Sequence, residues 1–199
     1  EKIKDGSTKE QKIIDITVVE KPTGEISLGA GLGTNGGSVA FSISENNYMG
    51  AGVKLSSSLE LNKETVRGEV SVAKPNYNYS GNELNFNISS IRNDKADSGY
   101  SNKIFQTGIG TAFEQYKDIY ISPRIGFSND SLTVQSSASD SLKKQKGTFT
   151  DLTFDYGITL DKRNRAFKPT SGYKSSFGQT LPVFADSPYI KNSYAFSAY

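Results

Sequence analysis

Charged side chains are concentrated in one short segment near the end of the sequence. It holds one carboxylate, Asp161, and three cations, Lys162, Arg163 and Arg165. Such a cation cluster can bind a phosphate or a lipid headgroup, and Asp161 could orient Arg163 through a charge-assisted hydrogen bond. The residues that follow include Pro and Gly at positions that suit a hairpin turn. These residues alone leave two interpretations open, an anion site or a charged turn with a structural role.

The rest of the sequence offers little for catalysis. It contains no His and no Cys, which excludes a Ser-His-Asp triad, a thiol nucleophile and most zinc sites within these residues. Residues 31–36 match the dinucleotide pattern G-x-G-x-x-G, but that pattern binds phosphate only where a strand runs into a helix. Here residues 38–43 alternate as a strand does. We therefore expect no enzyme activity, no cofactor and no metal.

Charge and hydropathy exclude other classes. The 23 Lys and Arg against 21 Asp and Glu give a net charge of +2, which gives no reason to expect nucleic acid as a partner. The sequence has no run of about 18 apolar residues, so no transmembrane helix is predicted. The first residues do not resemble a signal peptide, and the last ones stop within an alternating pattern. We expect the sequence to be a piece of a longer protein.

Alternation of apolar and polar residues recurs about every dozen residues, while helical periodicity is nearly absent. A short opening strand is predicted around Ile14, Ile16 and Val18. It ends at Pro22 and Gly24, which break strands and mark a candidate domain boundary. Ten more strands are predicted, at residues 26–32, 39–43, 53–61, 66–72, 84–88, 105–113, 119–127, 152–160, 173–179 and 194–199.

Strand and loop lengths favour a membrane barrel over a soluble β-sandwich. Strands of about 9–11 residues can cross a bilayer, and outer-membrane barrels alternate short periplasmic turns with long outer loops. Residues 93–102 and 129–148 are predicted as long loops, and residues 115–118 as a short turn. Tyrosines suit the boundary between lipid and water, and four are expected at the periplasmic ends of strands: Tyr48, Tyr77, Tyr79 and Tyr116.

Three segments have a distinctive order and spacing: V-E-K-P-T-G at residues 19–24, S-E-N-N-Y-M-G-A-G at 44–52 and D-x-R-x-x-x-F-x-P-T-x-G at 161–172. Together they resemble the BamA family of outer-membrane protein assembly factors and its surface-antigen relatives. The resemblance implies an all-β, antiparallel up-and-down transmembrane barrel of 16 strands. Residues 1–22 would be the end of the last POTRA domain, and residues 23–199 the first ten barrel strands.

One further segment is a false match to this family. The V-R-G-E sequence at residues 66–69 is similar to the family's luminal V-R-G-F motif. However, it lies in a predicted strand and has Glu in place of Phe, so we assign it no such role.

The resemblance also implies a function. The protein would fold and insert β-barrel proteins into the Gram-negative outer membrane, with its N-terminal flank in the periplasm. Its partners would be unfolded barrel clients, assembly-complex lipoproteins and outer-membrane lipid, with no nucleic acid. The residues of the D-x-R-x-x-x-F-x-P-T-x-G pattern would have a structural role in a turn: Asp161, Arg163, Phe167, Pro169, Thr170 and Gly172.

The first barrel strand would be a gate strand that pairs weakly and accepts a client strand. It consists of Glu25, Ile26, Ser27, Leu28, Gly29, Ala30, Gly31, Leu32 and Gly33. Its glycines give a physical rationale, because glycine weakens a strand and an unpaired edge can take up another strand. A related POTRA-barrel translocator, TamA-like or of the two-partner secretion type, is the alternative. A passive porin channel is a less favoured one.

Overall fold

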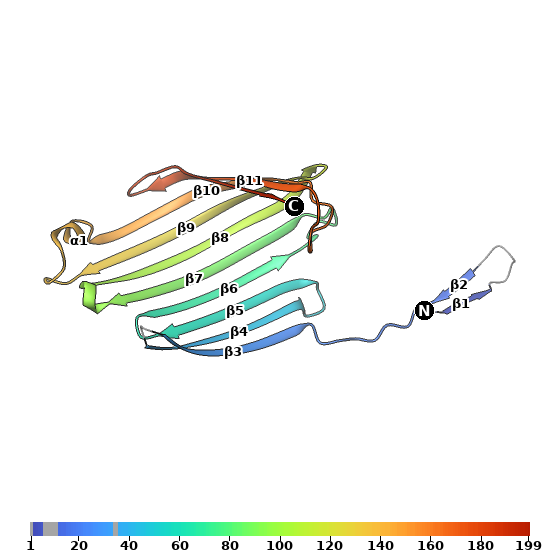
Figure 1. Cartoon of the computed structure of the whole chain (residues 1–199), viewed down its shortest axis with the longest axis horizontal. Coiled ribbons are helices and arrows are strands. Elements are labelled where there is room, and N and C mark those ends of the chain that lie inside the picture. The colour runs from blue at the N-terminus through green and yellow to red at the C-terminus, as the bar shows by residue number, and fades with distance from the viewer. Residues whose placement is uncertain (1, 6–11, 34–35) are drawn as a thin grey trace.

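The computed structural model describes residues 2–5, 12–33 and 36–199, which form a small hairpin and one large sheet (Figure 1). In the hairpin, β1 (Lys2–Asp5) and β2 (Lys12–Asp15) pair antiparallel. The sheet consists of β3 (Gly24–Gly33), β4 (Gly36–Tyr48), β5 (Val53–Asn62), β6 (Thr65–Lys74), β7 (Glu83–Lys95), β8 (Tyr100–Tyr116), β9 (Ile119–Val134), β10 (Gly147–Asp161), β11 (Tyr173–Ala185) and β12 (Lys191–Ala198). Two short helical elements, η1 (Ala96–Ser98) and α1 (Asp140–Lys144), lie in connections between strands. No helix in the described ranges is long and apolar enough to cross a membrane.

Each strand of the sheet pairs antiparallel with its neighbours in the sequence, from β3 at one edge to β12 at the other. Figure 1 shows the sheet curving from β3 to β11, with the two outermost strands at opposite edges. The predicted all-β, up-and-down fold is therefore confirmed, and the sheet is not closed.

The two faces of the sheet differ in composition. Strand register places Ile26 opposite Ile43 and Leu28 opposite Phe41, so apolar residues share one face. Their side chains are exposed, and among the described residues Ala138 is the one hydrophobic residue that is buried. An apolar face of this size would be a liability in water, whereas lipid would cover it. We call this the outer face, and the opposite one, rich in Ser, Gly, Asn and charged residues, the inner face.

Two predictions about strands and loops are wrong in detail. Six strands, β4 and β7–β11, exceed the predicted 9–11 residues, and β8 reaches 17. The predicted loops 93–102 and 129–148 are shortened at both ends, to residues 96–99 and 135–146, because polar side chains pair across the ladder. Asn93 donates to Asn102 over 3.0 Å, and Asn129 donates to Thr150 over 2.9 Å. Sequence polarity marks the limit of the apolar band, and the strands continue past that limit.

The lengths of the connections do not alternate as predicted. On the side where the N-terminal segment joins, residues 162–172 form a long connection between β10 and β11. It is similar in length to the connection of residues 135–146 at the opposite end. The predicted short turn after β8 is present, at residues 117–118.

The opening strand is also shorter than predicted. It ends at Asp15, and the exposed residues Ile16 and Val18 lie outside any strand. In the described hairpin Asp15 lies opposite Lys2, the first residue of β1. The domain division, with residues 1–22 as the end of a POTRA domain and 23–199 as barrel, stays a prediction.

Candidate functional site

The residues predicted to form the gate strand lie in β3, whose first end is held by side chains. The Thr23 hydroxyl donates to the Glu45 carboxylate of β4, and the Asn46 backbone N–H donates to the Thr23 carbonyl over 3.2 Å. The Asn47 backbone N–H also reaches Glu45, over 2.8 Å. This network fixes the point at which the chain enters the sheet.

The other end of the predicted gate strand is held by its backbone ladder with β4, which continues to Gly33 opposite Gly36, without side-chain hydrogen bonds. The side chains from Leu28 to Gly33 are those of Leu, Ala and Gly, which carry no hydrogen-bonding group, and the exposed fractions of Leu28 and Leu32 are 77% and 94%. In the described residues β3 and β12 are the two edge strands of the sheet, and each pairs with one neighbour, β4 and β11.

The glycines of the gate strand are not required by local packing. A Cβ added at Gly33 would meet nothing within 4 Å, and one at Gly29 would lie 3.9 Å from the Ala40 side chain. Gly31 is tighter, with the Ser38 hydroxyl 3.2 Å from such a Cβ. None of the three has a positive φ angle. Glycine at positions 29 and 33 therefore lowers the strand's pairing strength without serving the described fold.

Glycines elsewhere on the inner face have a packing reason. A Cβ at Gly157 would lie 2.6 Å from the Ser122 hydroxyl, and one at Gly178 would lie 2.8 Å from the Ser193 hydroxyl. At Gly108 a Cβ would lie 2.7 Å from Cζ of Arg124. The contrast separates these glycines, which make room for neighbouring side chains, from those of the gate strand.

Within the turn motif, Asp161 and Arg163 form a two-bond ion pair. Arg163 Nε donates to Asp161 Oδ1 over 2.8 Å, and Nη2 donates to Oδ2 over 2.6 Å. The hydrogen bonds from Arg163 lower the pKa of Asp161 to about 2, although burial acts in the opposite direction. Arg163 Nη1 also reaches the Ala166 carbonyl, over 3.2 Å. The guanidinium is thus committed to the turn itself.

The remaining residues of the motif close the turn. Asn164 bridges it, accepting from the Thr170 backbone N–H and donating to the Thr170 hydroxyl, over 3.1 and 2.9 Å. Gly172 has a φ of +97°, and a Cβ there would overlap the Lys162 carbonyl oxygen. Pro169 lies between Asn164 and Gly172, in the connection from β10 to β11.

The turn is also tied to its surroundings. Lys162 Nζ donates to Asp118 over 2.8 Å, which raises the pKa of Lys162, and the Asp161 backbone N–H donates to the Asp118 carbonyl over 2.9 Å. Asp118 belongs to the connection between β8 and β9. On the other side, the Tyr199 backbone N–H donates to the Gly172 carbonyl over 3.0 Å. This geometry is what a structural turn requires.

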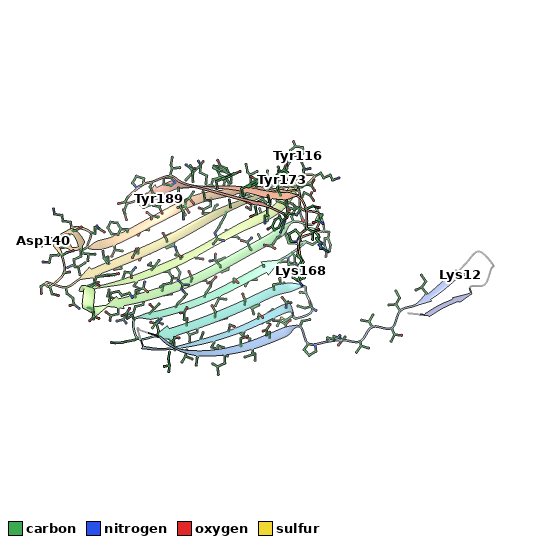
Figure 2. All side chains as sticks on the ribbon, in the orientation of Figure 1. Lys12, Tyr116, Asp140, Lys168, Tyr173 and Tyr189 are labelled. Carbon is green, nitrogen blue, oxygen red and sulfur yellow. The ribbon has the colours of Figure 1, made fainter. Side chains whose placement is uncertain are left out.

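Phe167 differs from the rest of the motif. Its side chain is 78% exposed, and the Lys168 ammonium lies 5.4 Å from the centroid of its ring. Figure 2 shows Lys168, Tyr116 and Tyr173 at the end of the sheet where the N-terminal segment joins, and Asp140 at the opposite end. The predicted tyrosines also lie there: Tyr48 ends β4, Tyr116 ends β8, and Tyr77 and Tyr79 lie between β6 and β7.

The sequence patterns missed a row of polar residues across the inner face. Strand register aligns one residue from each of six strands: Asn85, Gly110, Arg124, Asp155, Thr180 and Lys191. Arg124 reaches over Gly108 of β8 to donate to Asn87 of β7. The available signal was the set of glycines at inward positions of β8–β11. No group of three or more possible metal ligands occurs in the described ranges.

An open, antiparallel sheet with an apolar outer face and a polar inner face defines the wall of a transmembrane β-barrel. The Omp85 superfamily domain matches residues 47–199, about three quarters of the chain. The chain therefore belongs to the Omp85 superfamily, whose members are outer-membrane barrels that insert or translocate proteins.

A solved structure has the same fold. The crystal structure of BamA from Haemophilus ducreyi lacking POTRA domains 1–3 superposes with a TM-score of 0.71 at 21% sequence identity. The match covers 90% of this chain and 38% of that one, so the chain spans well under half of the BamA chain it matches. The resemblance to this family and the all-β, up-and-down barrel fold are confirmed. The total of 16 strands stays a prediction.

Proposed function

We propose that the complete protein folds and inserts β-barrel proteins into the outer membrane through an opening at the gate strand. Unfolded barrel proteins would be its clients, and accessory lipoproteins and outer-membrane lipid its other partners. The N-terminal flank would lie in the periplasm. The work would be done by backbone pairing, without catalysis or a cofactor.

The observation that carries this proposal is the asymmetry of β3. Its start is fixed by the Thr23–Glu45 network, while its far half carries glycines at 29 and 33 that packing does not require. Each glycine in a strand costs roughly 0.5–1 kcal/mol relative to alanine. Glycine at three alternate positions would therefore weaken the pairing of β3 by about 1.5–3 kcal/mol relative to alanine.

A weakly paired edge has a direct use in strand templating. A client strand can add to the free N–H and C=O groups of β3 by β-augmentation, which requires no particular client side chains. A weak edge also releases a completed client more readily, because few contacts have to be broken. The fixed start of β3 would keep the register while the far end exchanges partners.

A crosslinking scan tests the proposal. Single cysteines are introduced along residues 25–33 of the full-length protein, and nascent barrel clients carrying one cysteine in their terminal strands are supplied. Disulfide capture should be strong along β3. A matched scan along residues 84–90 of β7, which is paired on both sides, should capture little.

The outcomes separate the alternatives. Capture of barrel clients confined to β3 supports assembly. Absence of capture at every β3 position, in variants that still support growth, would contradict it. Capture of secreted passengers instead of barrel clients would favour the related translocator.

A further inference from the structure

Two cations lie directly opposite each other on the outer face. Strand register pairs Arg92 of β7 with Lys103 of β8, and both belong to the face that carries Phe86 and Phe105. Like charges at directly opposed positions of an antiparallel pair destabilise a sheet. An anion bound between the two cations would offset this destabilisation.

The protein itself balances this charge poorly. The carboxylate on this face next to the pair is Asp94, 3.9 Å from Arg92, and the two side chains are 64% and 50% exposed. Lys103 makes no ion pair or side-chain hydrogen bond with any residue in the described ranges. Both side chains are therefore available to a ligand.

The surroundings of Lys103 combine polar groups with aromatic rings. A hollow of about 640 Å³ is lined by Ser90, Lys103, Phe105, Phe127, Asn129, Ser131 and Thr148. The rings of Phe105 and Phe127 meet edge to face, with centroids 6.4 Å apart. The hydroxyls of Ser131 and Thr148 contact each other over 3.2 Å at the polar side of the hollow. A ligand that fits has an anionic, hydrogen-bonding head and an apolar tail.

The height of the cation pair matches the boundary of the membrane. Lys103 and Phe113 are ten residues apart on β8, or about 34 Å along a strand that rises about 3.4 Å per residue. At a tilt of about 40° this corresponds to about 26 Å in height, close to the apolar band of about 25 Å in outer-membrane barrels. Since Phe113 is near the end of the strand where the N-terminal segment joins, Lys103 lies at the opposite membrane surface.

We propose that the pair of Arg92 and Lys103 binds the phosphate of a phosphorylated glycolipid in the outer leaflet, with acyl chains along Phe105 and Phe127. The proposal takes the orientation of the barrel from the proposed function, but not its assembly activity. Two cations on neighbouring strands hold one phosphate from both sides, as charge-assisted hydrogen bonds allow. A bound lipid would also rigidify β7 and β8 in the wall of the barrel.

Lipid binding to the full-length protein tests this site. The purified protein in detergent is titrated with diphosphoryl lipid A, and bound lipid is measured by native mass spectrometry. The double variant R92Q/K103Q should bind about tenfold more weakly, equivalent to about 1.4 kcal/mol. The charge-retaining variant R92K/K103R should keep most of the binding. A dephosphorylated lipid A should bind wild type and R92Q/K103Q equally.

A matched control removes two cations nearby. Lys143 and Lys144 belong to α1 at the same end of the sheet, and K143Q/K144Q should bind as wild type does. Normal migration of unheated protein in a gel establishes that each variant folds. Wild-type affinity in R92Q/K103Q or an equal loss in K143Q/K144Q would each overturn the proposal.

Discussion

Arg163 lies two residues after Asp161 and binds both of its carboxylate oxygens, over 2.8 and 2.6 Å. The exposed fractions of the two side chains are 22% for Asp161 and 15% for Arg163. A planar guanidinium suits a carboxylate in this two-bond geometry, which lysine cannot reproduce. The pair therefore sets the shape of the turn in which it lies, and leaves little of Arg163 for an external anion.

This ion pair should make the stability of the turn depend on pH in the acidic range. The pKa of Asp161 is about 2 in the fold, against 3.8 for an ordinary aspartate. A lowered pKa contributes stability that is fully present above pH 4 and is lost as the pH falls toward 2. In full-length protein unfolded by guanidinium, D161N should be less stable than wild type at pH 6, and the difference should shrink between pH 4 and pH 2.

Two comparisons sharpen this measurement. R163Q should lose the same pH-dependent stability, and D161N/R163Q should be little worse than either single variant, because both remove one interaction. Asp140, whose side chain is 92% exposed, provides the control. D140N should change stability little at any pH, and a pH profile like that of D161N would contradict the assignment.

Gly172 should tolerate no side chain. Its φ of +97° is unfavourable for alanine, and a Cβ would overlap the Lys162 carbonyl and lie 2.9 Å from Cα of Arg163. Backbone atoms cannot move aside as a flexible side chain can. We expect G172A to destabilise the full-length protein by about 3 kcal/mol or more, from the left-handed conformation together with the overlap.

Gly50 allows the two contributions to be separated. Its φ is +70°, but a Cβ there would meet nothing within 4 Å. G50A should cost only the conformational part, about 1–2 kcal/mol. Equal losses in G50A and G172A, measured by guanidinium unfolding, would show that the overlap at Gly172 is relieved at no cost.

Gly108 and Arg124 should be energetically coupled. A Cβ at Gly108 would lie 2.7 Å from Cζ of Arg124, whose side chain passes over this glycine to Asn87. G108A should displace the guanidinium, break its hydrogen bond and cost about 1–3 kcal/mol. In R124A/G108A the obstacle is gone, so the double variant should be more stable than the sum of the single losses predicts, by about 1 kcal/mol.

A parallel substitution provides a check on this coupling. Gly33 has room for a Cβ and lies far from Arg124 in the register. The combination R124A/G33A should therefore be additive. Additivity of R124A/G108A as well, in the same unfolding assay, would mean that Arg124 does not depend on Gly108.

The strands could be predicted from the sequence because each one has one face toward lipid and the other toward the polar interior of the barrel. Ile26, Leu28 and Leu32 alternate with glycine and serine, and the register places them on one face as predicted. The ends of the strands were not readable. Asn93 and Asn102 look like loop residues because they are polar, yet they pair across β7 and β8 above the apolar band.

The candidate sites also differ in whether the sequence alone could predict them. The Asp161–Arg163 bond could be anticipated because its partners are two residues apart. The row from Asn85 to Lys191 could not, because it depends on the register of six strands, which no local pattern determines. The opposed cations Arg92 and Lys103 were hidden for the same reason, since their juxtaposition exists only in the ladder of β7 and β8.

The gate strand should become more stable and less active when its glycines are replaced. Because Gly29 and Gly33 have room for a Cβ and ordinary φ angles, alanine there should stabilise the pairing of β3 with β4, by about 0.4–1 kcal/mol each. If weak pairing is what the strand is for, G29A/G33A should insert a barrel client into proteoliposomes several-fold more slowly than wild type. The matched variant G68A, in β6 with nothing within 4 Å of its Cβ, should leave insertion unchanged. Faster or unchanged insertion by a stabilised G29A/G33A protein would contradict the link between weak pairing and function. A loss of both stability and insertion would instead mean that the glycines are needed for the fold, which their open surroundings argue against.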